Sequence, residues 1–73
     1  MDIKTVKEFR KAVKDCREVR IGVRFGVADA YVKIAKADAL KLVKGWGGNT
    51  TGRELEMYTG DFGRLEDGIL YAG

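Results

Sequence analysis

Residues 18–25 read Glu-Val-Arg-Ile-Gly-Val-Arg-Phe, and apolar residues occupy every second position of this stretch. A period of two places such residues on one face of a β-strand, where they can pack against a core. The apolar positions, which we expect to point inward, are Val19, Ile21, Val23 and Phe25. The intervening positions, expected to point outward, are Glu18, Arg20, Gly22 and Arg24. The stretch therefore predicts a half-buried strand with a partly basic outer face.

The same alternation resumes a few residues later. Residues 31–35 read Tyr-Val-Lys-Ile-Ala, with Val32 and Ile34 expected to point inward. The link at residues 26–29 is too short for the crossover that parallel strands require. The two stretches are therefore predicted to pair as an antiparallel hairpin.

A helix is predicted before this hairpin. Residues 5–8, Thr-Val-Lys-Glu, fit a capping box, in which Thr5 and Glu8 satisfy each other's backbone donors. Apolar residues then recur at spacings of three and four, as on one face of a helix of about ten residues. They are Val6, Phe9, Ala12, Val13 and Cys16.

A second helix is predicted after the hairpin. The apolar period lengthens again at residues 36–44, where Val43 and either Ala39 or Leu40 share one face. Gly45 stands where a left-handed C-terminal cap is expected.

Two short strands are predicted to complete the chain. Residues 45–52 contain four glycines and predict a loop, and residues 54–58 alternate as a strand. A turn is expected at residues 60–63. Asp-Gly at residues 67–68 is a favourable hairpin dipeptide before a last strand at residues 69–71.

The predicted order is helix-strand-strand-helix-strand-strand, which indicates an α+β fold. An antiparallel sheet with two helices packed on one face buries both apolar stripes. The 73 residues are expected to form a single domain, residues 1–73.

The composition argues against catalysis. The sequence has no His and no Ser, so the usual nucleophile–base pairs cannot be assembled. Cys16 is the only cysteine, so neither an internal disulfide nor a His/Cys zinc site is available. A site built from Asp and Glu remains possible in principle, but we expect no catalytic residues, metal or cofactor. No apolar run approaches membrane-spanning length and no signal peptide is evident, which favours a cytoplasmic protein.

Charge is unevenly distributed along the chain. Residues 1–44 hold 12 Lys/Arg against 6 Asp/Glu (+6), whereas residues 45–73 hold 2 against 5 (−3), giving the net charge of +3. If the first helix lies near the first long strand, its cations are expected to form one basic surface with those of the strand. The candidate partner-binding residues are Lys7, Arg10, Lys11, Lys14, Arg17, Arg20 and Arg24. Such a field would attract an acidic partner, although a solvated helix face is the simpler explanation.

Trp46, between two glycines directly after the second predicted helix, has two interpretations. It could cap the edge of the core, or it could anchor a partner, since Trp is enriched at interface hot spots.

An acidic protein surface and a nucleic acid could both be bound by the basic residues. Sheets that bind RNA usually expose stacking aromatic residues, and Tyr31 is the one aromatic residue expected on the outer face. The acidic C-terminal part would also repel phosphate. These observations favour a protein partner.

In its length, its element order and the phrase Val-Lys-Ile-Ala-Lys-Ala-Asp-Ala-Leu at residues 32–40, the chain resembles the small host-takeover proteins of bacteriophages. It is similar in size and basic character to inhibitors and antiterminators of host RNA polymerase from Xanthomonas phages. The resemblance implies a protein that binds the polymerase, blocks initiation at promoters and promotes read-through of terminators. It assigns no role to individual residues.

The leading hypothesis is therefore a non-enzymatic, phage-type regulatory protein that binds an acidic surface of a host protein, with RNA polymerase as the suspected partner. One alternative is a basic nucleic-acid-binding module that uses the same cations. Another is a self-associating structural protein, in which an open sheet edge pairs with a second copy.

Overall fold

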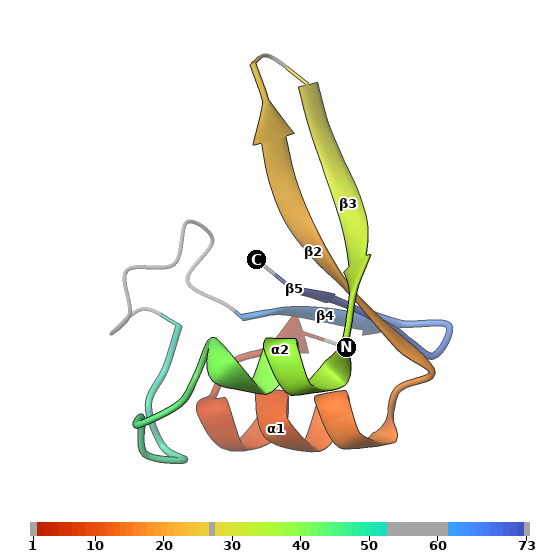
Figure 1. The fold of residues 1–73 in the computed structure, drawn as a ribbon. Coiled ribbons are helices and arrows are strands. Elements are labelled where there is room, and N and C mark those ends of the chain that lie inside the picture. The colour runs from red at the N-terminus through yellow and green to blue at the C-terminus, as the bar shows by residue number, and fades with distance from the viewer. Residues whose placement is uncertain (1, 27, 53–61, 73) are drawn as a thin grey trace.

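The computed structural model describes residues 2–26, 28–52 and 62–72. Within these ranges the chain forms a five-stranded sheet in the order β1-β4-β5-β2-β3, with both helices on one face (Figure 1). The elements in chain order are β1 (Asp2–Ile3), α1 (Val6–Asp15), β2 (Glu18–Phe25), β3 (Ala28–Ile34), α2 (Lys36–Lys41), β4 (Gly63–Glu66) and β5 (Ile69–Ala72). The predicted α+β class and the placement of the helices are confirmed. The strand predicted at residues 54–58 lies outside the described residues.

Helix α1 begins and packs as its sequence pattern predicts. The Thr5 hydroxyl accepts a hydrogen bond from the Glu8 backbone N–H at 3.2 Å, which satisfies one of the unpaired amides of the first turn. The Glu8 carboxylate accepts a hydrogen bond from the Thr5 hydroxyl at 3.2 Å, so only half of the predicted capping box has its expected form. The buried residues of the helix are Val6, Phe9, Ala12 and Val13, and Cys16 is buried directly after it.

The β2–β3 hairpin is antiparallel, from Val19 opposite Ile34 to Phe25 opposite Ala28. Strand β3 begins inside the predicted link. Val32 lies on the inner face of the sheet as expected, opposite Ile21, but it is 44% exposed and so lies outside the core. Strand β5 pairs with β2 only as far as Ile21, and beyond this point the hairpin projects away from the helices (Figure 1). Val32 lies opposite Ile21, where that projection begins.

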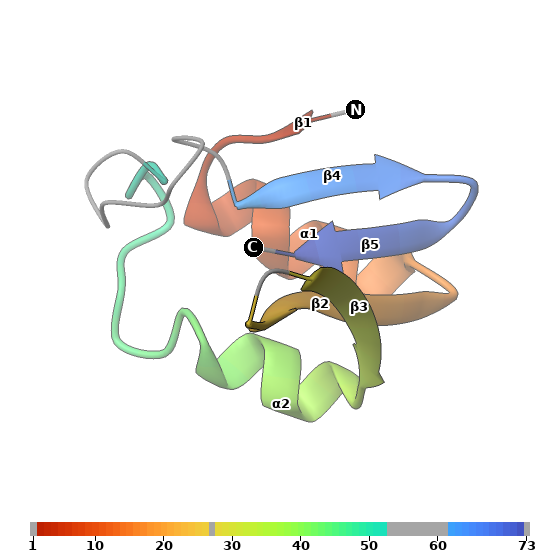
Figure 2. The same cartoon turned by 90° about the horizontal axis from the view of Figure 1, so that it is seen from above.

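The sheet is mixed, so the prediction of a purely antiparallel sheet is wrong. Strand β5 runs parallel to β2, with Val19 opposite Leu70 and Ile21 opposite Ala72. Parallel pairing needs a long connection, and here β3, α2 and β4 intervene between the two strands. Strand β5 consequently lies between β4 and β2 in the sheet (Figure 2).

The C-terminal hairpin forms at the predicted dipeptide. Asp67 and Gly68 have φ values of 53° and 79°, as the two central positions of a type I′ turn require. Strand β4 occupies Gly63–Glu66, where the sequence predicted a turn ending at Gly63 and no strand. Strand β1, which pairs with β4, is only two residues long and was not predicted.

Helix α2 is shorter than predicted, because turns replace the helix at residues 42–45. Ala39 and Val43 are buried, whereas Leu40 is exposed. Phe9 of α1 packs against Phe62 with ring centroids 5.8 Å apart at the centre of the core. No helix in the described part of the chain has the length and apolar character needed to cross a membrane.

Candidate functional site

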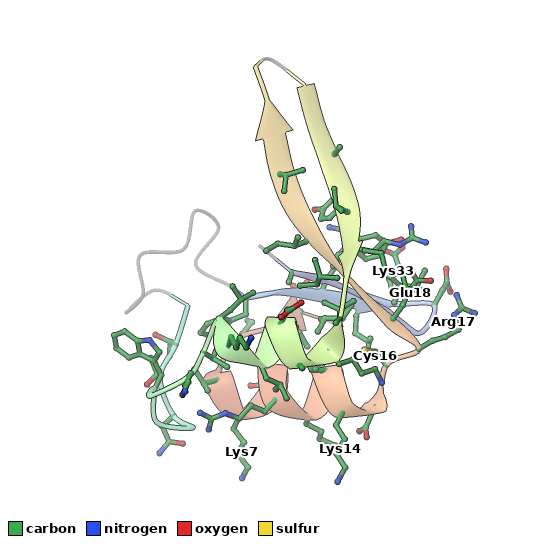
Figure 3. All side chains as sticks on the ribbon, viewed as in Figure 1. Lys7, Lys14, Cys16, Arg17, Glu18 and Lys33 are labelled. Atoms are coloured by element: carbon green, nitrogen blue, oxygen red, sulfur yellow. The ribbon has the colours of Figure 1, made fainter. Side chains whose placement is uncertain are left out.

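The predicted basic residues lie on two opposite sides of the molecule. The side chains of Lys7 and Lys14 extend from α1 away from the sheet (Figure 3). Arg20 follows Val19, which is fully buried against the helices, so Arg20 points to the other face of the sheet. The expectation of one continuous basic surface formed by the first helix and the first long strand is therefore wrong. The physical reason is that the sheet itself separates the two sets of cations.

On the helix side, four of the predicted cations are exposed. They are Lys7, Arg10, Lys11 and Lys14. Arg17 is also exposed, but it follows α1 and lies at the edge of the sheet near Glu18 and Lys33 (Figure 3). Arg10 is already engaged, because its guanidinium donates hydrogen bonds to the Trp46 carbonyl at 2.8 Å and to the Val43 carbonyl at 3.4 Å. These bonds hold the end of the α2 segment against α1. The side chain of Arg24 lies outside the part of β2 whose side chains are described.

Trp46 is 48% exposed. Its backbone carbonyl is held by Arg10, so the chain is fixed at this position while the indole remains accessible. This exposure favours the partner-anchor interpretation over the interpretation that Trp46 caps the core.

An open groove of about 730 Å³ lies between α1 and α2. Its lining includes three apolar residues, Val13, Ala37 and Leu40. Five cations also line it, namely Arg10, Lys14, Lys36, Lys41 and Lys44, and none of the carboxylates in the described residues belongs to the lining. The sequence analysis identified Arg10 and Lys14 but missed the three lysines of the α2 segment. The three lysines were visible in the sequence, but only the packing of α2 beside α1 shows that they line the same groove.

Lys36 has a structural role at one end of this groove. Its ammonium group donates hydrogen bonds to the Cys16 carbonyl at 2.6 Å and to the Lys14 carbonyl at 3.3 Å. A cation at the C-terminus of a helix is favoured, because the last carbonyls are unpaired and carry partial negative charge. Lys36 therefore joins the start of α2 to the end of α1 and fixes the groove at that end.

The face of the sheet opposite the helices carries a row of aromatic and basic residues. Arg64 of β4 lies opposite Tyr71 of β5, Tyr71 lies opposite Arg20 of β2, and Arg20 lies opposite Lys33 of β3. Tyr31 of β3 joins the row beside Gly22, and its ring contacts Tyr71 edge-to-face with centroids 5.1 Å apart. We refer to Arg20, Tyr31, Lys33, Arg64 and Tyr71 as the Tyr–Arg row.

The two arginines of this row lie over the tyrosine rings. The guanidinium of Arg64 is 4.8 Å from the Tyr71 centroid and 5.9 Å from that of Tyr31, and Arg20 is 5.9 Å from the Tyr71 centroid. Such distances allow cation–π attraction. The sequence analysis treated Tyr31 as a lone outward aromatic residue. It missed Tyr71, because an antiparallel sheet gave no reason to place β5 beside β2.

Each arginine of the row is paired with a carboxylate two residues away on its own strand. Arg20 Nε lies 3.0 Å from Glu18 Oε2, and Arg64 Nε lies 3.1 Å from Glu66 Oε2. The hydrogen bond from Arg20 lowers the pKa of Glu18 below its ordinary value of 4.5, with smaller contributions from the charges of Lys33 and Arg17. Hydrogen bonds to Glu66 and Tyr31 raise the pKa of Arg64.

These pairs predict a pH effect that can be measured residue by residue. Replacing Arg20 with leucine is expected to return the pKa of Glu18 toward 4.5, because the hydrogen bond is the largest cause of the shift. Since the folded pKa is lowered, the pair stabilises the fold above the unfolded pKa, and this stabilisation disappears as the pH falls through the folded value. An NMR titration of the Glu18 carboxyl carbon from about pH 2 to about pH 7 would give the pKa of Glu18 in the parent protein and in the Arg20→Leu variant. Lys33→Leu is the control. It removes a nearby charge but no hydrogen bond to Glu18, so it should raise the pKa of Glu18 less than Arg20→Leu does. If Lys33→Leu raised the pKa of Glu18 as much as Arg20→Leu or more, the hydrogen bond from Arg20 would not be the main cause of the lowered pKa.

In the described residues, no three Cys, Asp or Glu side chains gather closely enough to hold a metal ion. Comparison with known protein families, characterised proteins and solved structures finds no match for the chain. Within the described residues, the α1–α2 groove and the Tyr–Arg row are the two candidate binding surfaces.

Proposed function

We propose that this protein is a non-enzymatic regulator that binds an acidic, partly apolar segment of a partner protein in the groove between α1 and α2. One observation carries the proposal: among the residues that the structure describes, five cations and three apolar residues line the groove and no carboxylate does. The cations supply long-range attraction for an acidic segment, and the apolar floor supplies contact area that loses water on binding.

The apolar floor favours protein over nucleic acid as the occupant of the groove. Leu40 is exposed there beside Ala37, and burying an apolar side chain stabilises a complex only when the partner offers apolar surface in return. A segment that alternates carboxylates with apolar side chains meets both requirements, as an amphipathic helix does when it lies in a groove. Trp46, fixed by Arg10 and exposed, could extend the interface past the end of α2.

The partner proposed for testing first is bacterial RNA polymerase, on the strength of the resemblance to phage host-takeover proteins. In this proposal the protein acts in the cytoplasm of a bacterial host, where it blocks promoter-dependent initiation and promotes antitermination. Occupation of the groove by an acidic segment of the polymerase would be the first step.

Charge reversal inside the groove is expected to weaken binding to the partner. The double variant Lys14→Glu/Lys44→Glu should reduce affinity for purified bacterial RNA polymerase by about tenfold or more, because each change replaces attraction with repulsion. Biolayer interferometry at two salt concentrations would measure both the affinity and its salt dependence. Arg10 is left intact in this test, because its hydrogen bonds to two backbone carbonyls hold the fold.

The matched control is Lys7→Glu/Lys11→Glu. It changes the net charge by the same amount, at two exposed positions of α1 that do not line the groove. This variant should bind within about threefold of the parent protein. Equal losses in the two double variants would show that only overall charge matters and would overturn the groove as the site. Absence of binding by the parent protein would exclude the polymerase as the partner.

A further inference from the structure

We infer that the Tyr–Arg row is a second binding site, on the opposite side of the molecule from the groove, and that it takes single-stranded nucleic acid by stacking unpaired bases. The inference is independent of the proposed function, since the two surfaces share no residue. It rests on the arrangement of two tyrosines and three cations on the sheet face opposite α1 and α2 (Figure 1).

The row runs across neighbouring strands and not along one of them. Arg64, Tyr71, Arg20 and Lys33 come from β4, β5, β2 and β3 in the order in which these strands lie side by side. Adjacent strands are about 4.8 Å apart. Four successive positions therefore offer a strip roughly 14 Å long, enough for two or three nucleotides laid across the sheet.

The aromatic residues are held in a form suited to stacking. Tyr31 is 47% exposed, and its ring is supported at the edge by Tyr71 and from one side by Arg64. Gly22 lies opposite Tyr31 on β2, and the Tyr31 ring extends over this position toward Tyr71. A base could stack on the accessible part of this ring without rearrangement of the sheet, because every base has a flat π face.

The cations of the row lie where phosphates would follow the bases. Glu18 and Glu66 bind Arg20 and Arg64 through Nε, which fixes each guanidinium beside the Tyr71 ring. Planar guanidinium groups stack on bases and also donate to phosphate oxygens. The nearby carboxylates moderate the positive charge, so stacking is expected to contribute more to the affinity than counterion release does. The row therefore fits an unpaired strand better than a duplex, whose bases stack on one another and present only their edges.

Fluorescence anisotropy with a labelled thymidine 12-mer, compared with a duplex of the same length, would test the inference. The single strand is expected to bind more tightly than the duplex, and Tyr31→Ala should weaken single-strand binding by roughly 5- to 100-fold. Tyr31→Phe keeps the ring and should bind within about threefold of the parent. Thermal unfolding of each variant is the control that separates a loss of binding from a loss of folded protein.

The groove variant separates this site from the proposed function. Lys14→Glu/Lys44→Glu should keep the advantage of single strand over duplex, and Tyr31→Ala should keep its affinity for the polymerase. Tighter binding of the duplex, or an effect of Tyr31→Ala smaller than twofold on single-strand binding, would overturn the inference. A loss of polymerase binding in Tyr31→Ala with no change in oligonucleotide binding would also overturn it, and would make the row a protein interface.

Discussion

Replacing Gly63 with alanine is expected to separate β4 from β5 and to unfold most of the protein. Gly63 has a φ of 135°, in a region that residues with a side chain avoid, and occupying it costs them about 1–3 kcal/mol. A Cβ at this position would overlap the Tyr71 carbonyl oxygen and lie 2.9 Å from the Cα of Ala72. Both atoms belong to the backbone of the central strand, which cannot move aside without losing its pairing with β4 or β2.

The overlap with backbone atoms adds to this conformational cost, so the total loss is expected to be comparable with the whole stability of the domain. A domain of under about 80 residues rarely has more than about 3–5 kcal/mol of net stability from its core. Urea unfolding followed by circular dichroism should show Gly63→Ala largely unfolded before any denaturant is added. Gly22→Ala is the control, because its Cβ would meet only ordinary contacts at 3.5 Å and 3.7 Å, and its stability should change by less than about 1 kcal/mol. A cooperative transition for Gly63→Ala near that of the parent would show that the strand pairing described here is wrong.

Phe9→Ala is expected to have a comparable effect through the core. Phe9 is almost completely buried, and it packs against Phe62, which follows the long connection from α2. Removing a buried phenylalanine ring costs about 3–5 kcal/mol, because burial of the ring is lost and a cavity remains. The same unfolding experiment would measure this loss. Lys11→Ala, at an exposed position of the same helix, should stay within about 0.5 kcal/mol of the parent. A loss of unfolding free energy below about 1 kcal/mol for Phe9→Ala would contradict the packing of the Phe9 ring in the core.

The strand β2, the helix α1 and the last hairpin were predictable, because a short stretch of consecutive residues contains the pattern that specifies each of them. Alternation gave the bounds of β2, the spacing of Phe9 and Val13 gave the buried face of α1, and Asp67 with Gly68 gave the last hairpin. Strand β1 is too short to show any period. The pattern around Val32 was that of a buried strand, but burial also depends on what lies against the strand, and the hairpin projects past the helices there.

The two candidate surfaces were less predictable, because each is made by elements that are distant in the sequence. The groove depends on the packing of Lys41 and Lys44 beside Lys14, which follows from the docking of α2 against α1 and not from either helix alone. The pairing of Tyr31 with Tyr71 requires β5 to lie beside β2, and a parallel pair separated by some 50 positions leaves no trace in local periodicity.

The position of β5 between β4 and β2 sets the order in which the chain can fold during synthesis. The backbone hydrogen bonds within α1 and between β2 and β3 are local, so neither element needs a later segment for its own pairing. Residues 69–72 supply partners for both β4 and β2, so the sheet remains in two separate pieces until β5 emerges. A nascent chain stalled before residue 69 is therefore expected to expose its apolar face and to be sensitive to proteases, whereas a chain carrying a linker after residue 73 should be resistant.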